Sequence, residues 1–165
     1  MPRFAEVRHE EWMAADPAVV RSQFADLEHH IATNVHPKLR LVVQQRSPQR
    51  TRYLQEVTLL GMRQRDVFER EHGADGSMTD TSVEGFNRGG SLHFEFRPEA
   101  RGARPGTVVA VRVRLPLPPV VGRLVRPLLE SQIRKELLAA VAEDKYDLEV
   151  RGYAGPPRSR PGSVA

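Results

Sequence analysis

The sequence predicts one α+β domain in which a curved antiparallel sheet of seven strands wraps around a long C-terminal helix. Six strand-length segments with alternating apolar and polar residues follow one another between residues 38 and 115, and turn residues separate them. After them, apolar residues recur every three or four positions over residues 121–141. Consecutive strands with short links form antiparallel hairpins, and an amphipathic helix buries its apolar stripe against such a sheet.

The N-terminal segment adds a seventh strand and a first helix. Residues 3–13 alternate around Phe4 and Val7, which is typical of a strand. Asp16 and Pro17 predict the start of a helix, because Asp caps backbone N–H groups and Pro fits the first helical position. We expect the helix to end shortly before His36-Pro37, since a residue before proline is pushed out of the α region.

The six further strands are expected at residues 38–46, 52–59, 63–71, 78–86, 91–97 and 107–115. In the last of these, valines occupy one parity while Arg112 and Arg114 occupy the other. In residues 91–97, Leu92, Phe94 and Phe96 share one parity in the same way. The sequence therefore predicts that one face of the sheet is covered and the other is wet.

The covering element is the helix expected over residues 121–141, with Pro127 as a kink or as its true start. Its predicted stripe includes Leu128 and Leu137, so we expect both to be core residues. The domain is expected to span residues 1–153, and residues 154–165 (AGPPRSRPGSVA) are typical of a disordered tail.

Composition excludes several classes of site. The chain of 165 residues has no cysteine, which excludes disulfides, thiolate metal sites and cysteine nucleophiles. Its 25 basic and 21 acidic residues are interspersed and only 6% of residues are aromatic, so we expect no nucleic-acid partner. No apolar run reaches membrane-spanning or signal-peptide length, which favours a cytoplasmic protein without integral membrane contact. The few lysines beside much Ala, Val and Pro indicate a bacterial coding bias.

Three segments carry a resemblance to a known family: ADPAVVRSQFADLEHH in the first helix, NVHPKL before the second strand, and LLESQIRKELLAAVAEDKYDLE in the last helix. Together with the order of elements, they resemble the START-like superfamily, also called SRPBCC or helix-grip proteins. This superfamily includes polyketide cyclases, lipid-transfer domains and Bet v 1 allergens. The resemblance covers roughly residues 4 to 150 and implies the helix-grip fold.

The resemblance also implies a cavity between sheet and helix that takes an apolar or aromatic small molecule, lipid-like or polyketide-like. The first hypothesis is a binding or transfer protein, and the second is a cyclase/aromatase-like enzyme. Two or more titratable groups converging in the cavity would favour the enzyme, and a purely apolar cavity would favour the carrier. By their positions on the elements, five residues are the candidate ligand contacts: His30, His36, Tyr53, Gln132 and Arg134.

Three of the six histidines, at positions 29, 30 and 36, raise the question of a metal site. Ligands on one helix usually lie three or four residues apart, because those positions share a face. His29 and His36 are seven apart, and His30 and His36 are six apart. The spacing therefore predicts histidines at a helix end, with no metal site and no cofactor.

A third hypothesis comes from another branch of the superfamily. The catalytic domains of Rieske oxygenases hold non-haem iron with an Asp-x-x-His-x-x-x-x-His segment and an aspartate on the C-terminal helix. Asp26 to His29, with Glu143-Asp144, resembles parts of that pattern. The second histidine would fall at Asn34, and the missing cysteines remove a Rieske cluster. The non-haem iron hypothesis is therefore the weakest of the three.

Overall fold

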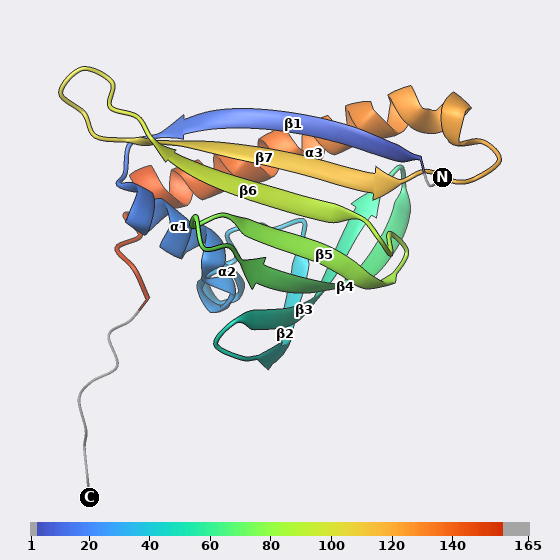
Figure 1. Ribbon diagram of the computed structural model, residues 1–165, viewed down its shortest axis with the longest axis horizontal. Helices are drawn as coiled ribbons and strands as arrows, with labels where there is room; N and C mark the ends of the chain where they lie inside the picture. The colour runs from blue at the N-terminus through green and yellow to red at the C-terminus, as the bar shows by residue number, and fades with distance from the viewer. Residues whose placement is uncertain (1–2, 157–165) are drawn as a thin grey trace, which may run out of the picture.

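A computed structural model describes residues 3–156, so residues 157–165 of the expected tail lie outside the described residues. Ten elements follow one another along the chain (Figure 1). They are β1 (Phe4–Met13), α1 (Pro17–Ala25), α2 (Leu27–Thr33), β2 (Arg40–Arg46), β3 (Arg50–Leu59), β4 (Met62–His72), β5 (Met78–Gly85), β6 (Ser91–Pro98), β7 (Thr107–Pro116) and α3 (Gly122–Glu149).

The seven strands form one antiparallel sheet in the order β1-β7-β6-β5-β4-β3-β2. The predicted seven-stranded α+β fold with a long C-terminal helix is confirmed. The two edge strands, β1 and β2, are joined by the segment that contains α1 and α2. These two helices lie near the C-terminal end of α3 (Figure 1).

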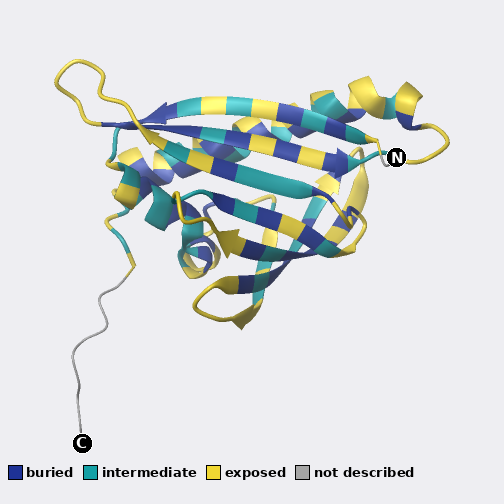
Figure 2. Cartoon of the chain, in the orientation of Figure 1, coloured by how far each residue is buried: buried dark blue, intermediate teal, exposed yellow. Residues whose placement is uncertain are grey.

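The covered face of the sheet is the one that the alternation predicts. Val109, Val111 and Val113 are buried in the same apolar cluster as Ile133 and Leu137 of α3. Arg112 and Arg114 are exposed on the opposite face. Figure 2 shows this alternation along the sheet, where buried and exposed positions follow one another.

The apolar stripe of α3 is narrower than the spacing indicates. Leu137 is 9% exposed, but Leu128 is 61% exposed, so the expectation that Leu128 is a core residue is wrong. Most of the buried positions of the helix follow one line, Leu129, Ile133, Leu137, Val141, Asp144 and Leu148. Neighbouring positions point about 100° away from that line, because an α-helix has 3.6 residues per turn.

The first helix is also different from its prediction. One helix was expected from Pro17 to near Thr33, and the structure has two, separated at Asp26. Asp26 has φ −84° and ψ 75°, and its side chain accepts a hydrogen bond from the backbone N–H of His29. It therefore ends α1 and caps α2. Among the described residues, no helix combines the length and the apolar character needed to span a membrane.

Candidate functional site

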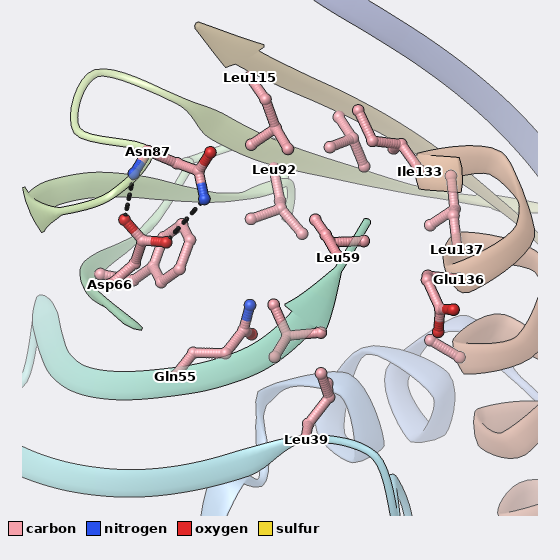
Figure 3. Close-up of a pocket in the computed structure, with 14 residues that line it drawn as sticks. Leu39, Gln55, Leu59, Asp66, Asn87, Leu92, Leu115, Ile133, Glu136 and Leu137 are labelled. Carbon is pink, nitrogen blue, oxygen red and sulfur yellow. Dashed lines mark hydrogen bonds between the residues drawn. The ribbon is translucent and has the colours of Figure 1, made fainter. Parts of the chain in front are cut away.

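A cavity lies between the concave face of the sheet and α3. Leucine and valine side chains from the sheet meet Ile133 and Leu137 of the helix around it (Figure 3). Gln55, Asp66 and Asn87 add polar groups on the sheet side. The cavity encloses about 670 Å³ of space between atoms, its mouth included. That figure includes space open to solvent, so the enclosed part of the cavity is smaller.

A second cavity, of about 590 Å³ with its mouth, extends this space toward α2. The two share five lining residues, Leu39, Gln55, Leu92, Leu137 and Ala140, so they adjoin each other. We call the two together the helix–sheet cavity. Its middle is mainly apolar, whereas its α2 end is lined by His30, His36, Asp144 and the trio Tyr53, Arg70 and Asp80.

The polar end at α2 depends on a tight turn. The helix ends at Asn34, which adopts the left-handed conformation with φ 52°, and the backbone N–H of Val35 donates to the carbonyl of His30. Asn tolerates this conformation better than most residues. The turn sends the chain back toward the helix it has just left. His36 therefore lies beside His30, with ring centroids 5.1 Å apart, although the two are six residues apart.

Both histidines contact one carboxylate from α3. The Nε2 atoms of His30 and His36 lie 3.0 and 3.3 Å from Oδ1 of Asp144. The other ring nitrogens are also engaged: Nδ1 of His30 donates to the carbonyl of Asp26 at 2.7 Å, and Nδ1 of His36 lies 2.8 Å from Oε2 of Glu143. We call His30, His36 and Asp144 the His–His–Asp cluster.

Burial and charge oppose each other in this cluster. Burial lowers the pKa of His36, but the hydrogen bonds and charges of Asp144 and Glu143 outweigh it and raise the pKa to about 9. Burial raises the pKa of Asp144, while hydrogen bonds and charge from His30 and His36 hold it well below its usual range. In the absence of other ligands, the cluster therefore keeps an ionised carboxylate beside a cationic ring.

A second layer of polar groups holds the cluster in place. The side-chain amide of Gln23, which is fully buried, donates to Asp144 at 3.0 Å and to Asp147 at 3.1 Å. His29 contacts Asp147 at 2.8 Å, and its ring packs on Tyr153. His29 thus faces a different carboxylate from its neighbour His30.

The trio of Tyr53, Arg70 and Asp80 lies beside the cluster. Arg70 donates two hydrogen bonds of 2.7 Å to the two oxygens of Asp80, and Tyr53 donates a third of 2.7 Å. All three are buried, and Arg70 also donates to the carbonyl of Phe24 at 2.9 Å. Burial, and then the charge of Asp80, raise the pKa of Tyr53 well above its ordinary value, so its hydroxyl stays a donor.

At the opposite end of the cavity, Asp66 accepts from the backbone N–H and the side-chain amide of Asn87 at 2.6 and 2.8 Å (Figure 3). Ser82 adds a hydrogen bond of 3.1 Å to the same carboxylate. Both ends of the apolar cavity are therefore lined by ordered polar groups.

Three of the five predicted contact residues, His30, His36 and Tyr53, line the helix–sheet cavity. The other two do not: Gln132 donates to Glu136, and Arg134 is exposed and donates to the carbonyl of Arg8. They flank Ile133, which takes the one cavity-facing position in that turn. The structure therefore does not bring these two residues together with His30, His36 and Tyr53.

The spacing argument against a metal site assumed that both ligands lie on one helix. In the structure, the turn at Asn34 brings His36 back to His30. Sequence reasoning also missed Arg70 and Asp80. Strand parity could have indicated both. Arg70 shares the buried parity of β4 with Asp66 and Phe68. Asp80 shares the buried parity of β5 with Met78 and Ser82.

Comparison with solved structures finds the same architecture. TTHA0849 from Thermus thermophilus has a TM-score of 0.77 and 23% identity, over 89% of this chain and 99% of that one. The Zhui aromatase/cyclase from a Streptomyces species has a TM-score of 0.68 and 14% identity, over 92% and 100%. A START superfamily protein from Mycobacterium smegmatis has a TM-score of 0.69 and 17% identity, over 87% and 98%.

No family model matches the sequence, and neither does any curated protein. The likeness to these solved structures shows that the chain has the helix-grip fold, which the sequence resemblance also implies. Identities this low show the fold alone, and the function has to be argued from the site.

Proposed function

We propose that this protein binds a hydrophobic or aromatic small molecule, lipid-like or polyketide-like, in the helix–sheet cavity. The observation that carries this proposal is the pair of adjoining cavities, whose shared wall includes Leu39, Leu92 and Leu137 and whose polar groups lie mainly at the two ends. An apolar middle gives affinity by removing ligand surface from water, and the polar ends fix the ligand's orientation.

Binding is tested by filling the cavity. Ala140 lines both parts of it, whereas Ala142, half a turn away on the same helix, is exposed. The native protein should bind anilinonaphthalene sulfonate saturably at about one site and release it to polycyclic aromatics or fatty acids. Ala140→Phe should abolish this binding and Ala142→Phe should leave it unchanged. Equal binding by the two variants would contradict the proposal.

The second candidate function is a cyclase/aromatase-like enzyme. The convergence of His30, His36, Asp144 and Tyr53 on the cavity favours it, because placed acids and bases around a confined chain are sufficient for proton transfer. The name of the Streptomyces neighbour is consistent with it. In the reaction, an enol carbon attacks a ketone within the same molecule, forming one C–C bond and releasing one water.

The fate of a bound diketone that is able to cyclise distinguishes an enzyme from a carrier. An enzyme should accelerate loss of water from it, measured by mass spectrometry, and His36→Gln should slow that step with little change in binding. A carrier should return the diketone unchanged from the same cavity.

A further inference from the structure

We infer that the His–His–Asp cluster binds one divalent transition-metal ion of the Fe²⁺, Co²⁺ and Zn²⁺ class. The ligand atoms are Nε2 of His30, Nε2 of His36 and Oδ1 of Asp144. Two imidazoles and one carboxylate suit these ions, whereas Mg²⁺ and Ca²⁺ prefer sites made of oxygen alone.

The distances between the ligand atoms fit one ion. Ligand atoms about 2.1 Å from a metal lie about 3.0 Å apart at right angles and about 3.4 Å apart in a tetrahedron. Oδ1 of Asp144 lies 3.0 Å from one histidine nitrogen and 3.3 Å from the other. All three ligand atoms lie within 4.8 Å of one another, so the side chains would have to draw closer together around one ion.

The hydrogen bonds behind the rings direct both Nε2 atoms inward. The carbonyl of Asp26 can only accept, so Nδ1 of His30 carries the proton in that contact of 2.7 Å. The carboxylate of Glu143 does the same for Nδ1 of His36 at 2.8 Å. A backbone carbonyl or carboxylate behind each imidazole is the usual arrangement around metal-binding histidines, because it fixes the tautomer and the ring.

With this arrangement, a positive charge between the Asp144 carboxylate and the two Nε2 atoms is favourable. With neutral rings, two Nε2 lone pairs point at one oxygen of Asp144, which already accepts from Gln23. In the metal-free cluster, a proton on Nε2 of His36 supplies this charge, and the side-chain nitrogen of Gln23 lies 3.4 Å from Nε2 of His30. A second proton, on Nε2 of His30, would put like charges on two rings whose centroids are 5.1 Å apart. One metal ion satisfies all three ligand atoms at once.

The site is open on the cavity side. His30, His36 and Asp144 all line the helix–sheet cavity, and the protein supplies three ligands, so further coordination positions face that space. The ion would bind water there or an oxygen of a cavity ligand, such as a carbonyl, enolate or phenolate. Binding of the metal itself needs no organic ligand and does not depend on the proposed function.

The test is a titration of chelator-treated protein with Co²⁺. Wild-type protein should develop visible d–d absorption that saturates at about one equivalent, and its melting temperature should rise because the ion binds only the folded state. Zn²⁺ should abolish the absorption by competition, and excess Mg²⁺ should not. Elemental analysis of protein purified without chelator then identifies the ion that it carries from the cell.

Variants assign the ligands. His36→Ala and Asp144→Asn should each remove the saturable absorption. Glu143→Gln, which touches only the back of His36, should weaken binding by about 10–100-fold. The matched control is His29→Ala, because His29 is on the same helix but contacts Asp147, and it should bind Co²⁺ like the wild type.

The wild-type titration decides the inference even where a variant fails to fold. No saturable absorption and no rise in melting temperature with either Co²⁺ or Zn²⁺ would overturn it. Binding of several equivalents that survives in folded His36→Ala and Asp144→Asn proteins would also overturn it, because the ions would then lie elsewhere on the surface.

Discussion

At the scale of single residues, the buried pair of Arg70 and Asp80 makes the sharpest stability prediction. Asp80→Ala leaves the Arg70 guanidinium buried without its carboxylate, so the free energy of unfolding should fall by about 3–5 kcal/mol. Tyr53→Phe removes only one hydrogen bond to Asp80 and should cost about 1–3 kcal/mol. Urea unfolding of both variants measures the difference, and an equal loss would contradict the account of this pair.

His36 predicts a pH dependence in metal-free protein. Its folded-state pKa is raised from 6.5 to about 9, so its contribution to stability is complete below about pH 6.5 and is lost as pH rises through about 9. Asp144, whose pKa is lowered, contributes in the opposite direction: its stabilisation is lost in acid.

Urea unfolding with EDTA present checks the alkaline part of this prediction. The free energy of unfolding should fall by up to about 3 kcal/mol between about pH 6 and about pH 10. His36→Gln should remove most of that fall. A wild-type profile with the same slope as His36→Gln would show that His36 does not titrate as the contacts require.

Only those residues of the candidate site whose positions follow from local sequence signals could be predicted. His30, His36 and Tyr53 could be proposed from their positions on the elements: near the end of the first helix, directly before Pro37, and on a strand. In the sequence, Asp144 stands out only as part of the Rieske-like pattern, which fails at Asn34, so it is not among the predicted contacts. The burial of Asp144 depends on its contact with Gln23, which is far away in the sequence, so no local sequence pattern indicates it.

At the scale of elements, α3 provides a paired test of which face is buried. Leu137→Ala should lower the free energy of unfolding by about 2–5 kcal/mol, because it removes buried methyl groups and leaves a void. Leu128→Ala should change it by less than about 0.5 kcal/mol, because Leu128 is mainly exposed. Similar losses in the two variants, measured by urea unfolding, would contradict the placement of the helix.

The turn after α2 gives a second test at this scale. Asn34 has positive φ, so Asn34→Val should destabilise the turn by about 1–2 kcal/mol, whereas Asn34→Gly should be tolerated. Since the turn places His36, the Val variant should also bind Co²⁺ less tightly than the Gly variant. If the two folded variants gave identical Co²⁺ titrations, the turn would not be what positions His36 for metal binding.

Strands were the elements that the sequence predicted best, because alternation and turn residues are local signals. The division between α1 and α2 was missed for a physical reason. Phe24, Leu27 and Ile31 keep helical spacing across the break at Asp26, so apolar periodicity does not register it. What breaks the helix is the backbone and capping role of Asp26, which periodicity does not measure.

At the scale of the whole molecule, the order of elements was enough to predict the sheet and its covering helix, because short links restrict the topology. The cavity was only implied by resemblance. Whether a helix–sheet interior is filled depends on the volumes of side chains such as Ala140 and Leu92, which are far apart in the sequence.

The central claim, that a small apolar or aromatic molecule binds inside the molecule, can be followed with two NMR signals. The chain has only two isoleucines: Ile133 lines the cavity and is 4% exposed, and Ile31 is 44% exposed. In protein labelled at isoleucine δ1-methyl groups, titration with a naphthalene-based ligand should shift the Ile133 signal until it saturates and leave Ile31 nearly unchanged. An Ile133 signal that does not shift, whether or not the Ile31 signal shifts, would contradict the claim.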